Sequence, residues 1–316
     1  MNKERRKVQK IKGGSFIISL PSDWIEKNKV EPKEELTVIE DADGNLRISK
    51  RKGVPSSSVE IEGLGVEEIK YLVQAYYLMG STLIEVRSTD LIMPDVKKKI
   101  KELQMDLPGL ELIEERPYSI TFKAPIINER EFNQVLNYLI SSMSSIILEI
   151  MEGEKDIRFI LDARERGEEL YKKYKYLVRA LALGAVYPEG TNLNLTVKDM
   201  MVMAVVVRDL GRILTHLISL SIEMEGINKL ENNISKALEL VHSMFNISTS
   251  SLFQINVKMM RKLREAMEDI RRLEEEEIVR GRINEINLMR EIRRIASYCI
   301  GIMDSAINKS IKISFT

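Results

Sequence analysis

Apolar residues recur every three to four positions through almost all of residues 126–316, which is the spacing of amphipathic helices. The clearest run comprises Phe132, Val135, Leu136, Leu139, Met143, Ile146, Ile147 and Ile150. We predict six long helices in this part, at about 128–152, 155–184, 194–225, 228–250, 253–280 and 282–312. The chain is therefore expected to be mainly α-helical.

Residues 1–52 follow a different pattern, with short β-rich runs separated by turn residues. Ser15 to Leu20 is the strongest of these runs, and Pro21 is expected just inside the start of a short helix. Asp43-Gly44 lies between two further strands at 35–40 and 45–49, where a type I′ hairpin turn is expected. The predicted order is strand, strand, helix, strand, strand.

The middle part, residues 53–125, is predicted to be a small α/β domain. Residues 54–58 are expected to form a linker, and strands follow at 59–61, 81–86, 110–115 and 119–123, with helices at 66–79 and 94–107. This βαβαββ order suggests an open-faced sandwich. Lysines dominate the second helix, and we expect Lys97, Lys98, Lys99 and Lys101 to point largely outward.

Two of the predicted long helices share a pattern at a fixed offset of 82 residues. Arg208-Asp209-Leu210-Gly211-Arg212-Ile213 aligns with Arg290-Glu291-Ile292-Arg293-Arg294-Ile295. We interpret this as a duplication that gives a pair of three-helix bundles. The expected domains are therefore 1–52, 53–125, 126–226 and 227–316.

The composition fits a globular cytoplasmic protein. Hydrophobic residues make up 44% of the 316 residues and charged residues 30%. A single cysteine, Cys299, excludes an internal disulfide and fits a reducing compartment. The longest strongly apolar run, Met200 to Val207, is much shorter than a membrane span. We expect no signal peptide and no membrane insertion.

The net charge of zero conceals a basic N-terminus. Residues 1–52 carry 13 basic and 9 acidic side chains, and residues 53–125 carry 8 and 12. A local basic excess favours contact with a polyanion, although a solvated, frayed terminus has the same composition. The candidate phosphate contacts are Arg5, Arg6, Lys7, Lys10, Lys12 and, through its hydroxyl, Ser15.

Fifty residues of this kind bury too little surface to fold alone, so two copies are expected to share one core. The stretch from Lys10 to Trp24, with Gly14-Ser15 and Leu20-Pro21, and the later Asp43 to Leu46 resemble the AbrB/SpoVT-type swapped-hairpin domain. The resemblance implies a homodimeric barrel that binds DNA through the basic residues near its first strand. Such a domain can also serve only to dimerise.

The C-terminal helices resemble the PhoU family of phosphate-uptake regulators, which are built from two three-helix bundles. The resemblance rests on Arg208 to His216, Arg290 to Tyr298 and Ala306-Ile307-Asn308. Family members often bind metal through an acidic motif, but the matching positions here are Gly211, Thr215, Arg293 and Ser297. None is a carboxylate, so we expect no metal and no other cofactor. Asp209 and Glu291 are expected to form ion pairs within the bundle.

The sequence gives little support to an enzyme. His216 and His242 lack an evident nucleophile partner, and His216 is expected to be a hydrogen-bonded core or interface residue. The leading hypothesis is a DNA-binding transcription regulator of phosphate uptake. The alternative is a regulator that docks on a phosphate transporter or a signalling kinase and uses residues 1–52 only to dimerise. A metal-dependent scaffold with displaced ligands is the third.

Overall fold

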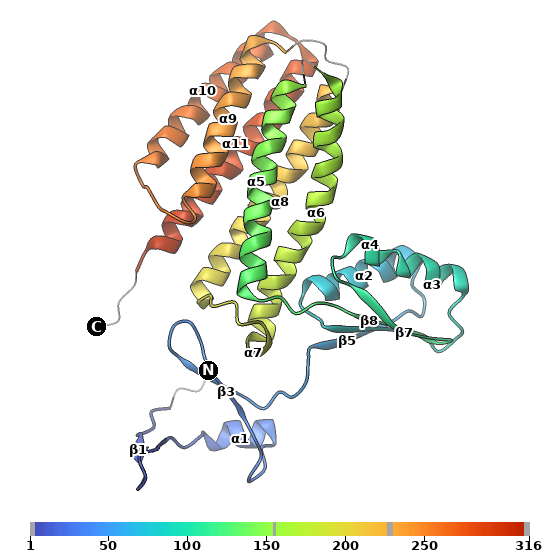
Figure 1. The fold of residues 1–316 in the computed structure, drawn as a ribbon, viewed down its shortest axis with the longest axis vertical. Coiled ribbons are helices and arrows are strands. Elements are labelled where there is room, and N and C mark those ends of the chain that lie inside the picture. Colours follow the sequence, from blue (N-terminus) through green and yellow to red (C-terminus); the bar gives the residue numbers. More distant parts are fainter. Residues whose placement is uncertain (1–3, 154–155, 226–229, 313–316) are drawn as a thin grey trace. The chain divides into compact units, whose positions relative to one another are not determined.

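A computed structural model describes residues 4–153, 156–225 and 230–312. The chain divides into two compact units, residues 1–53 and residues 54–316. Both are drawn in Figure 1, and each is described separately below.

Unit 1 contains two antiparallel hairpins and one short helix. Strand β1 (Gln9–Lys10) pairs with β2 (Phe16–Ile17), helix α1 follows (Ser22–Asn28), and β3 (Thr37–Glu40) pairs with β4 (Leu46–Ser49). The expected order of elements is therefore confirmed. Pro21 differs from the prediction, because it precedes the helix as its N-cap in an extended conformation.

The turn of the second hairpin is of another type than expected. The amide of Gly44 donates to the carbonyl of Asp41, and the amide of Asp41 donates to that of Asn45. Among Asp43 and Gly44, only Gly44 has a positive φ, of 76°. The loop is thus a three-residue turn that ends in a left-handed glycine, and the two-residue type I′ prediction was wrong.

The first part of unit 2 is a four-stranded sheet with helices on it. Its strands are β5 (Ser56–Glu60), β6 (Leu83–Arg87), β7 (Glu111–Arg116) and β8 (Ser119–Lys123), in the order β5-β6-β8-β7. Only the β5–β6 pair is parallel. Helices α2 (Val66–Leu78), α3 (Pro94–Lys101) and α4 (Leu103–Asp106) complete it. This is the expected βαβαββ order.

Three details of this part correct the predictions. Residues 56–58 are not linker but belong to β5, because they pair with β6. The predicted helix at 94–107 is divided at Glu102 into α3 and α4. Lys97 is buried and does not lie on the outer face of α3. Its ammonium group donates a hydrogen bond to the carbonyl of Arg116 at 2.5 Å.

The second part of unit 2 is helical. Within the described residues it comprises α5 (Glu129–Glu152), α6 (Ile157–Val186), the short α7 (Pro188–Thr191), α8 (Val197–Met224), α9 (Asn232–Ser250), α10 (Met259–Arg280) and α11 (Ile283–Ser310). Asn128 begins α5 with a capping box, in which its side chain and that of Glu131 each accept the other's backbone amide. The six long helices lie close to their predicted positions.

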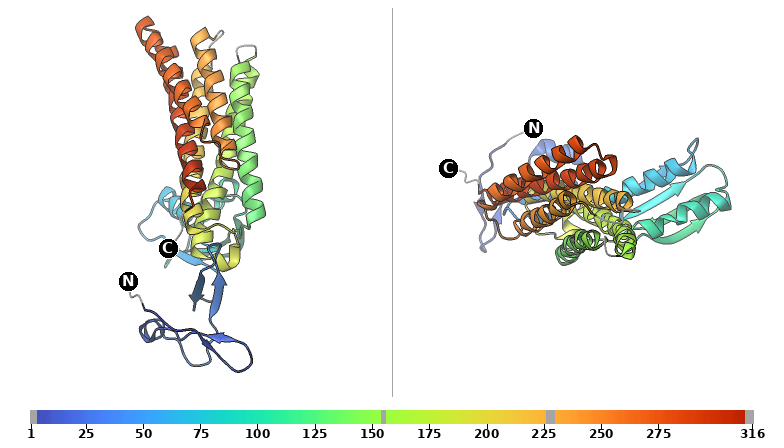
Figure 2. Two further views of the ribbon diagram at one scale, coloured as in Figure 1. Left: turned by 90° about the vertical axis from the view of Figure 1, so that its left-hand side faces the viewer. Right: turned by 90° about the horizontal axis from the view of Figure 1, so that it is seen from above.

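These helices run side by side along their lengths, as the two views of Figure 2 show. Helices α8 and α11 make the most extensive contact, and α11 also packs on α9 and α10. Buried side chains from both predicted halves form one continuous core, which extends from Ile127 to Ala306. The division into two three-helix bundles therefore stays a prediction.

A buried arginine joins the two parts of unit 2. Arg179 of α6 is fully buried and donates hydrogen bonds to the carbonyls of Tyr77, Ser81 and Pro125 at 2.6–3.1 Å. Its guanidinium lies 4.8 Å from the ring centre of Tyr77. Burial lowers the pKa of Arg179 to about 10, so it remains charged at neutral pH. This positive charge interacts favourably with the free carbonyls at the C-terminal end of α2.

Helix α5 is long and apolar enough to cross a membrane by length and composition alone. A core helix of a globular protein can meet the same criterion. Here Phe132, Leu136, Leu139 and Met143 of α5 are buried in the helical core, and α5 packs against α6 and α9. We therefore interpret α5 as a core helix.

Candidate nucleic-acid interface

The first hairpin of unit 1 is closed by two glycines. Gln9 pairs with Ile17 and Lys10 with Phe16. The amide of Ile11 donates to the carbonyl of Ser15 at 3.0 Å, and Gly13 and Gly14 both have a positive φ. Most residues with side chains avoid this conformation, so the Gly-Gly pair permits the tight return of the chain.

The structure places three of the six predicted contacts on this hairpin. Lys10 belongs to β1, with its ammonium group 5.8 Å from the ring centre of Phe16. Lys12 lies in the turn, and Ser15 directly precedes β2. The other three, Arg5, Arg6 and Lys7, precede β1, and Arg6 forms an ion pair with Glu4. All six side chains are exposed, so they remain available to a ligand.

Unit 1 has no core of its own. Among residues 4–53, all of which the structure describes, none is buried. Large apolar side chains are exposed instead, with Phe16 at 68% and Leu46 at 67%. The others are Val8, Ile11, Ile17, Ile18 and Val38. So much exposed apolar surface in so small a unit is typical of an interaction surface.

One polar network fixes the second half of unit 1. The carboxylate of Glu34 accepts from the ammonium group of Lys50 at 2.9 Å and from the amide of Glu31 at 3.1 Å. Lys50 also donates to the carbonyl of Lys29. The hydrogen bond from Lys50 lowers the pKa of Glu34, and the amide of Glu31 adds to the effect. The segment before β3 is thereby tied to the end of β4.

The PhoU-like motif positions have structural roles in unit 2. The hydroxyl of Thr215 donates to the carbonyl of Gly211, and that of Ser297 donates to the carbonyl of Arg293, each at 3.0 Å. Gly211 lies against the ring of Tyr174, where a Cβ atom would come within 2.5 Å. No group of three metal-ligating His, Cys, Asp or Glu side chains occurs among the described residues.

The acidic positions of the repeated pattern meet the opposite helix. Oε2 of Glu291 lies 2.7 Å from Nδ1 of His216, whose ring stacks on Tyr298. His216 is therefore a hydrogen-bonded core residue, as expected. The ion pair expected for Asp209 is wrong. This buried carboxylate faces Gly301 and forms no ion pair with any described residue. Burial raises the pKa of Asp209.

The structure also reveals a serine–histidine pair that the sequence did not indicate. Oγ of Ser144 on α5 lies 3.0 Å from Nε2 of His242 on α9. The same hydroxyl donates to Oδ1 of Asn246 at 2.9 Å, and Nδ2 of Asn246 lies 3.0 Å from Nε2 of His242. Burial lowers the pKa of His242. The trio therefore links helices α5 and α9.

Burial raises the pKa of Cys299 to about 12, so its thiol stays protonated at neutral pH.

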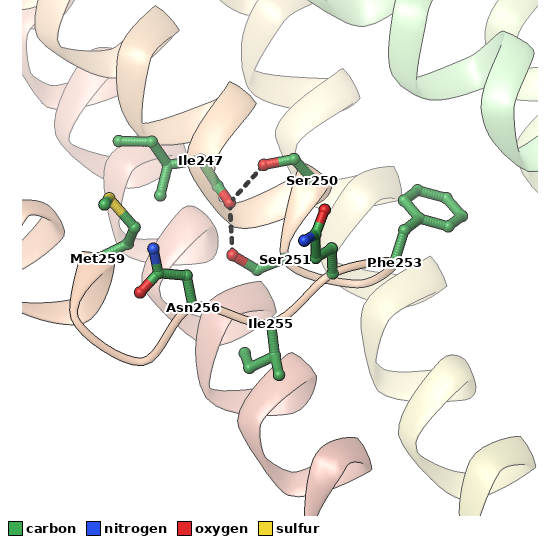
Figure 3. Close-up of a pocket in the computed structure, with 8 residues that line it drawn as sticks. Ile247, Ser250, Ser251, Phe253, Ile255, Asn256 and Met259 are labelled. Atoms are coloured by element: carbon green, nitrogen blue, oxygen red, sulfur yellow. Dashed lines mark hydrogen bonds between the residues drawn. The ribbon is translucent and has the colours of Figure 1, made fainter.

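A hollow of about 660 Å³ opens where α9 turns into α10, and Figure 3 shows its lining. Both Ser250 and Ser251 donate their hydroxyls to the carbonyl of Ile247 there. The lining contains no charged or histidine side chain, so it offers no general base.

Comparison with known protein families gives a match that covers most of unit 1 and the first three residues of unit 2. Residues 9–56 match the sequence model of the family described as "Antidote-toxin recognition MazE, bacterial antitoxin". The match spans well under half of the chain. Neither curated proteins nor solved structures gave a match. The matched segment contains both hairpins and α1, so it supports a MazE/AbrB-like domain at the N-terminus, a type of domain compatible with DNA-binding regulation.

Proposed function

We propose that this protein is a cytoplasmic, non-enzymatic transcription regulator that binds DNA as a homodimer through unit 1. The observation that carries the proposal is the exposed basic hairpin on a unit that has no core of its own. Its resemblance to AbrB/SpoVT domains and the MazE family match support the same reading. In a dimer the basic side chains are doubled, which favours contact with an extended row of phosphates.

The PhoU resemblance of α5–α11 supports a narrower proposal, in which the regulated process is phosphate uptake. The helical part would then be the sensing or docking module. A ligand or partner on this part can act only by binding one arrangement of the dimer better than another.

DNA binding is tested by fluorescence anisotropy with two duplexes, one from the region upstream of its own gene and one of random sequence. We expect affinity to fall steeply with salt, because each phosphate contact releases counterions. The Lys10→Ala/Lys12→Ala variant should bind more weakly and show a shallower dependence on salt. Undiminished binding by this variant would remove those two lysines from the interface.

The matched control is Lys98→Ala/Lys99→Ala, which removes the same charge from two exposed positions on α3. It should bind DNA like the unaltered protein. An equal loss in both variants would mean that overall charge, and not the hairpin, controls binding. Base specificity is given by the ratio of the affinities for the two duplexes, since phosphate contacts alone do not specify sequence.

A second candidate function rests on an apolar groove in unit 2. It has a volume of about 420 Å³ and lies between α6 and α8, with Met79, Leu181, Met200 and Met201 among its lining. Met79 and Met201 are largely exposed. Flexible methionines suit a surface that receives a partner helix. In this alternative unit 1 only dimerises, and the partner is a phosphate transporter component or a signalling kinase.

DNA retention separates the two candidates. A protein that dimerises but fails to bind either duplex at low salt supports the docking function. Met201→Asp should then abolish capture of the partner and leave the dimer intact.

A further inference from the structure

A polar hollow lies between the end of α8 and the first half of α11. Its volume is about 410 Å³, within the range of small-molecule sites. It is lined by Glu223 of α8 and by Asn287, Arg290, Glu291, Arg293 and Arg294 of α11. No apolar side chain belongs to this lining, which sets it apart from the groove between α6 and α8.

Its three arginines lie on one face of α11, because positions 290, 293 and 294 are three and four residues apart. Nε of Arg293 lies 2.8 Å from Oε2 of Glu274 on α10, so this charge is compensated. Arg290 and Arg294 are exposed and form no ion pair or side-chain hydrogen bond with any residue that the structure describes. Two positive charges are therefore free in the hollow.

The two carboxylates of the lining differ in their availability. Glu291 is already bound by His216, at 2.7 Å. Glu223 is exposed and has no partner within the described part of the chain. Glu223 is thus the lining group that competes with an anion for the arginines.

We propose that this hollow binds a small anion that bears a phosphate group. Guanidinium groups match phosphate oxygens in pairs, with shorter and stronger hydrogen bonds than neutral donors make. A phosphate group also offers three strong acceptor oxygens, so it can pair with Arg290 and Arg294 together. Asn287 adds an amide donor at the edge. The site goes beyond the proposed DNA binding and does not depend on it.

Calorimetry on the full-length protein without DNA tests the proposal, at constant ionic strength, with inorganic phosphate, pyrophosphate and ATP as probes. At least one probe should bind, and Arg290→Gln/Arg294→Gln should weaken it at least about tenfold. The matched control is Arg264→Gln/Arg271→Gln, which removes two exposed charges from α10 and should leave affinity within about twofold. The preferred probe distinguishes free phosphate from a nucleotide.

A second variant changes affinity in the opposite direction. Glu223→Gln should tighten binding severalfold, because it removes the competing carboxylate, while Glu239→Gln on the exposed face of α9 should not. A loss of fold cannot produce tighter binding, so this result is specific. The proposal is overturned if none of the three probes binds, if Arg290→Gln/Arg294→Gln binds as well as the unaltered protein, or if Glu223→Gln does not tighten binding.

Discussion

The two units solve the problem of burial in opposite ways. Unit 2 buries long apolar stripes in two clusters, one under its sheet and one among α5–α11. Unit 1 has comparable apolar residues in Phe16, Ile17, Val38 and Leu46, but it leaves them exposed. Secondary structure is present in both.

The difference shows that correct local structure does not make a stable unit. Residues 4–53 form their hairpins and helix with hydrogen bonds that water can replace at little net cost. In the proposed dimer their hydrophobic stabilisation comes from the second chain, whereas unit 2 supplies its own. Changes in unit 1 should therefore affect association, and changes in unit 2 should affect the free energy of unfolding.

The largest effect is expected from Arg179→Met. This change leaves the buried carbonyls of Tyr77, Ser81 and Pro125 without their donor, at a cost of about 3 kcal/mol or more. Urea unfolding followed by circular dichroism should show the loss in unit 2, with the dimer retained. Arg261→Met, at an arginine with a side chain 85% exposed, is the control and should change stability by less than about 0.5 kcal/mol.

Phe16→Asp should break the proposed dimer. Two copies of the ring would leave the shared core, which corresponds to about 3 kcal/mol or more per dimer and to roughly a hundredfold weaker association. Light scattering during gel filtration measures the mass. Val279→Asp, at a position 88% exposed in unit 2, should leave the mass unchanged. If the Phe16→Asp variant kept the mass of a dimer, the ring of Phe16 would be solvated in the unaltered protein and not part of a shared core.

Asn128→Ala should act on unit 2 alone and more weakly. It removes the side-chain acceptor of the capping box of α5 and should cost about 1 kcal/mol. The measurement is the urea midpoint of the unfolding of unit 2. Asn133→Ala, further along the exposed face of α5, is the control and should leave that midpoint almost unchanged. Equal shifts in the two variants would contradict the role of the cap.

The smallest effect is a pH dependence in unit 1. The pKa of Glu34 is lowered in the folded state, so its contribution to stability is present above the usual value of 4.5 and is lost as pH falls through the lowered pKa. Glu34→Gln should weaken this acid sensitivity. Fluorescence of Trp24, the single tryptophan, reports on unit 1 as the pH is lowered from 7 to 3. Identical acid profiles for both proteins would refute the assignment.

Most elements could be predicted from the sequence, because their periodic patterns are long and their breaks fall at glycine and proline. What could not be predicted depends on distant contacts. Lys97 can be buried because its ammonium group donates a hydrogen bond to the carbonyl of Arg116 and lies 3.7 Å from the carboxylate of Glu115. Glu277 stands in a run of four glutamates, yet it is fully buried, and the side chains of Asn233 and Arg280 donate hydrogen bonds to it.

The candidate site was predictable in part. The six proposed contacts are exposed and three of them share a hairpin, which the order of strands already implied. The Ser144–His242 pair joins residues 98 positions apart, so no local pattern could indicate it. The ion pair expected for Asp209 was wrong, because this carboxylate faces Gly301 of another helix, whereas Glu291 does meet a partner, His216, across the bundle.

The central place of α11 has a consequence for synthesis of the chain. This helix packs on α8 and also on α9 and α10. Helix α8 ends at Met224, and α11 begins only at Ile283, 59 residues later, and ends at Ser310. At about 5–20 residues per second, roughly 4–17 s separate the completion of α8 from that of α11. During that interval α8 can already pack on α6, but the side of α8 that faces α11 stays uncovered, and a ribosome-associated chaperone that binds apolar helices would find it there.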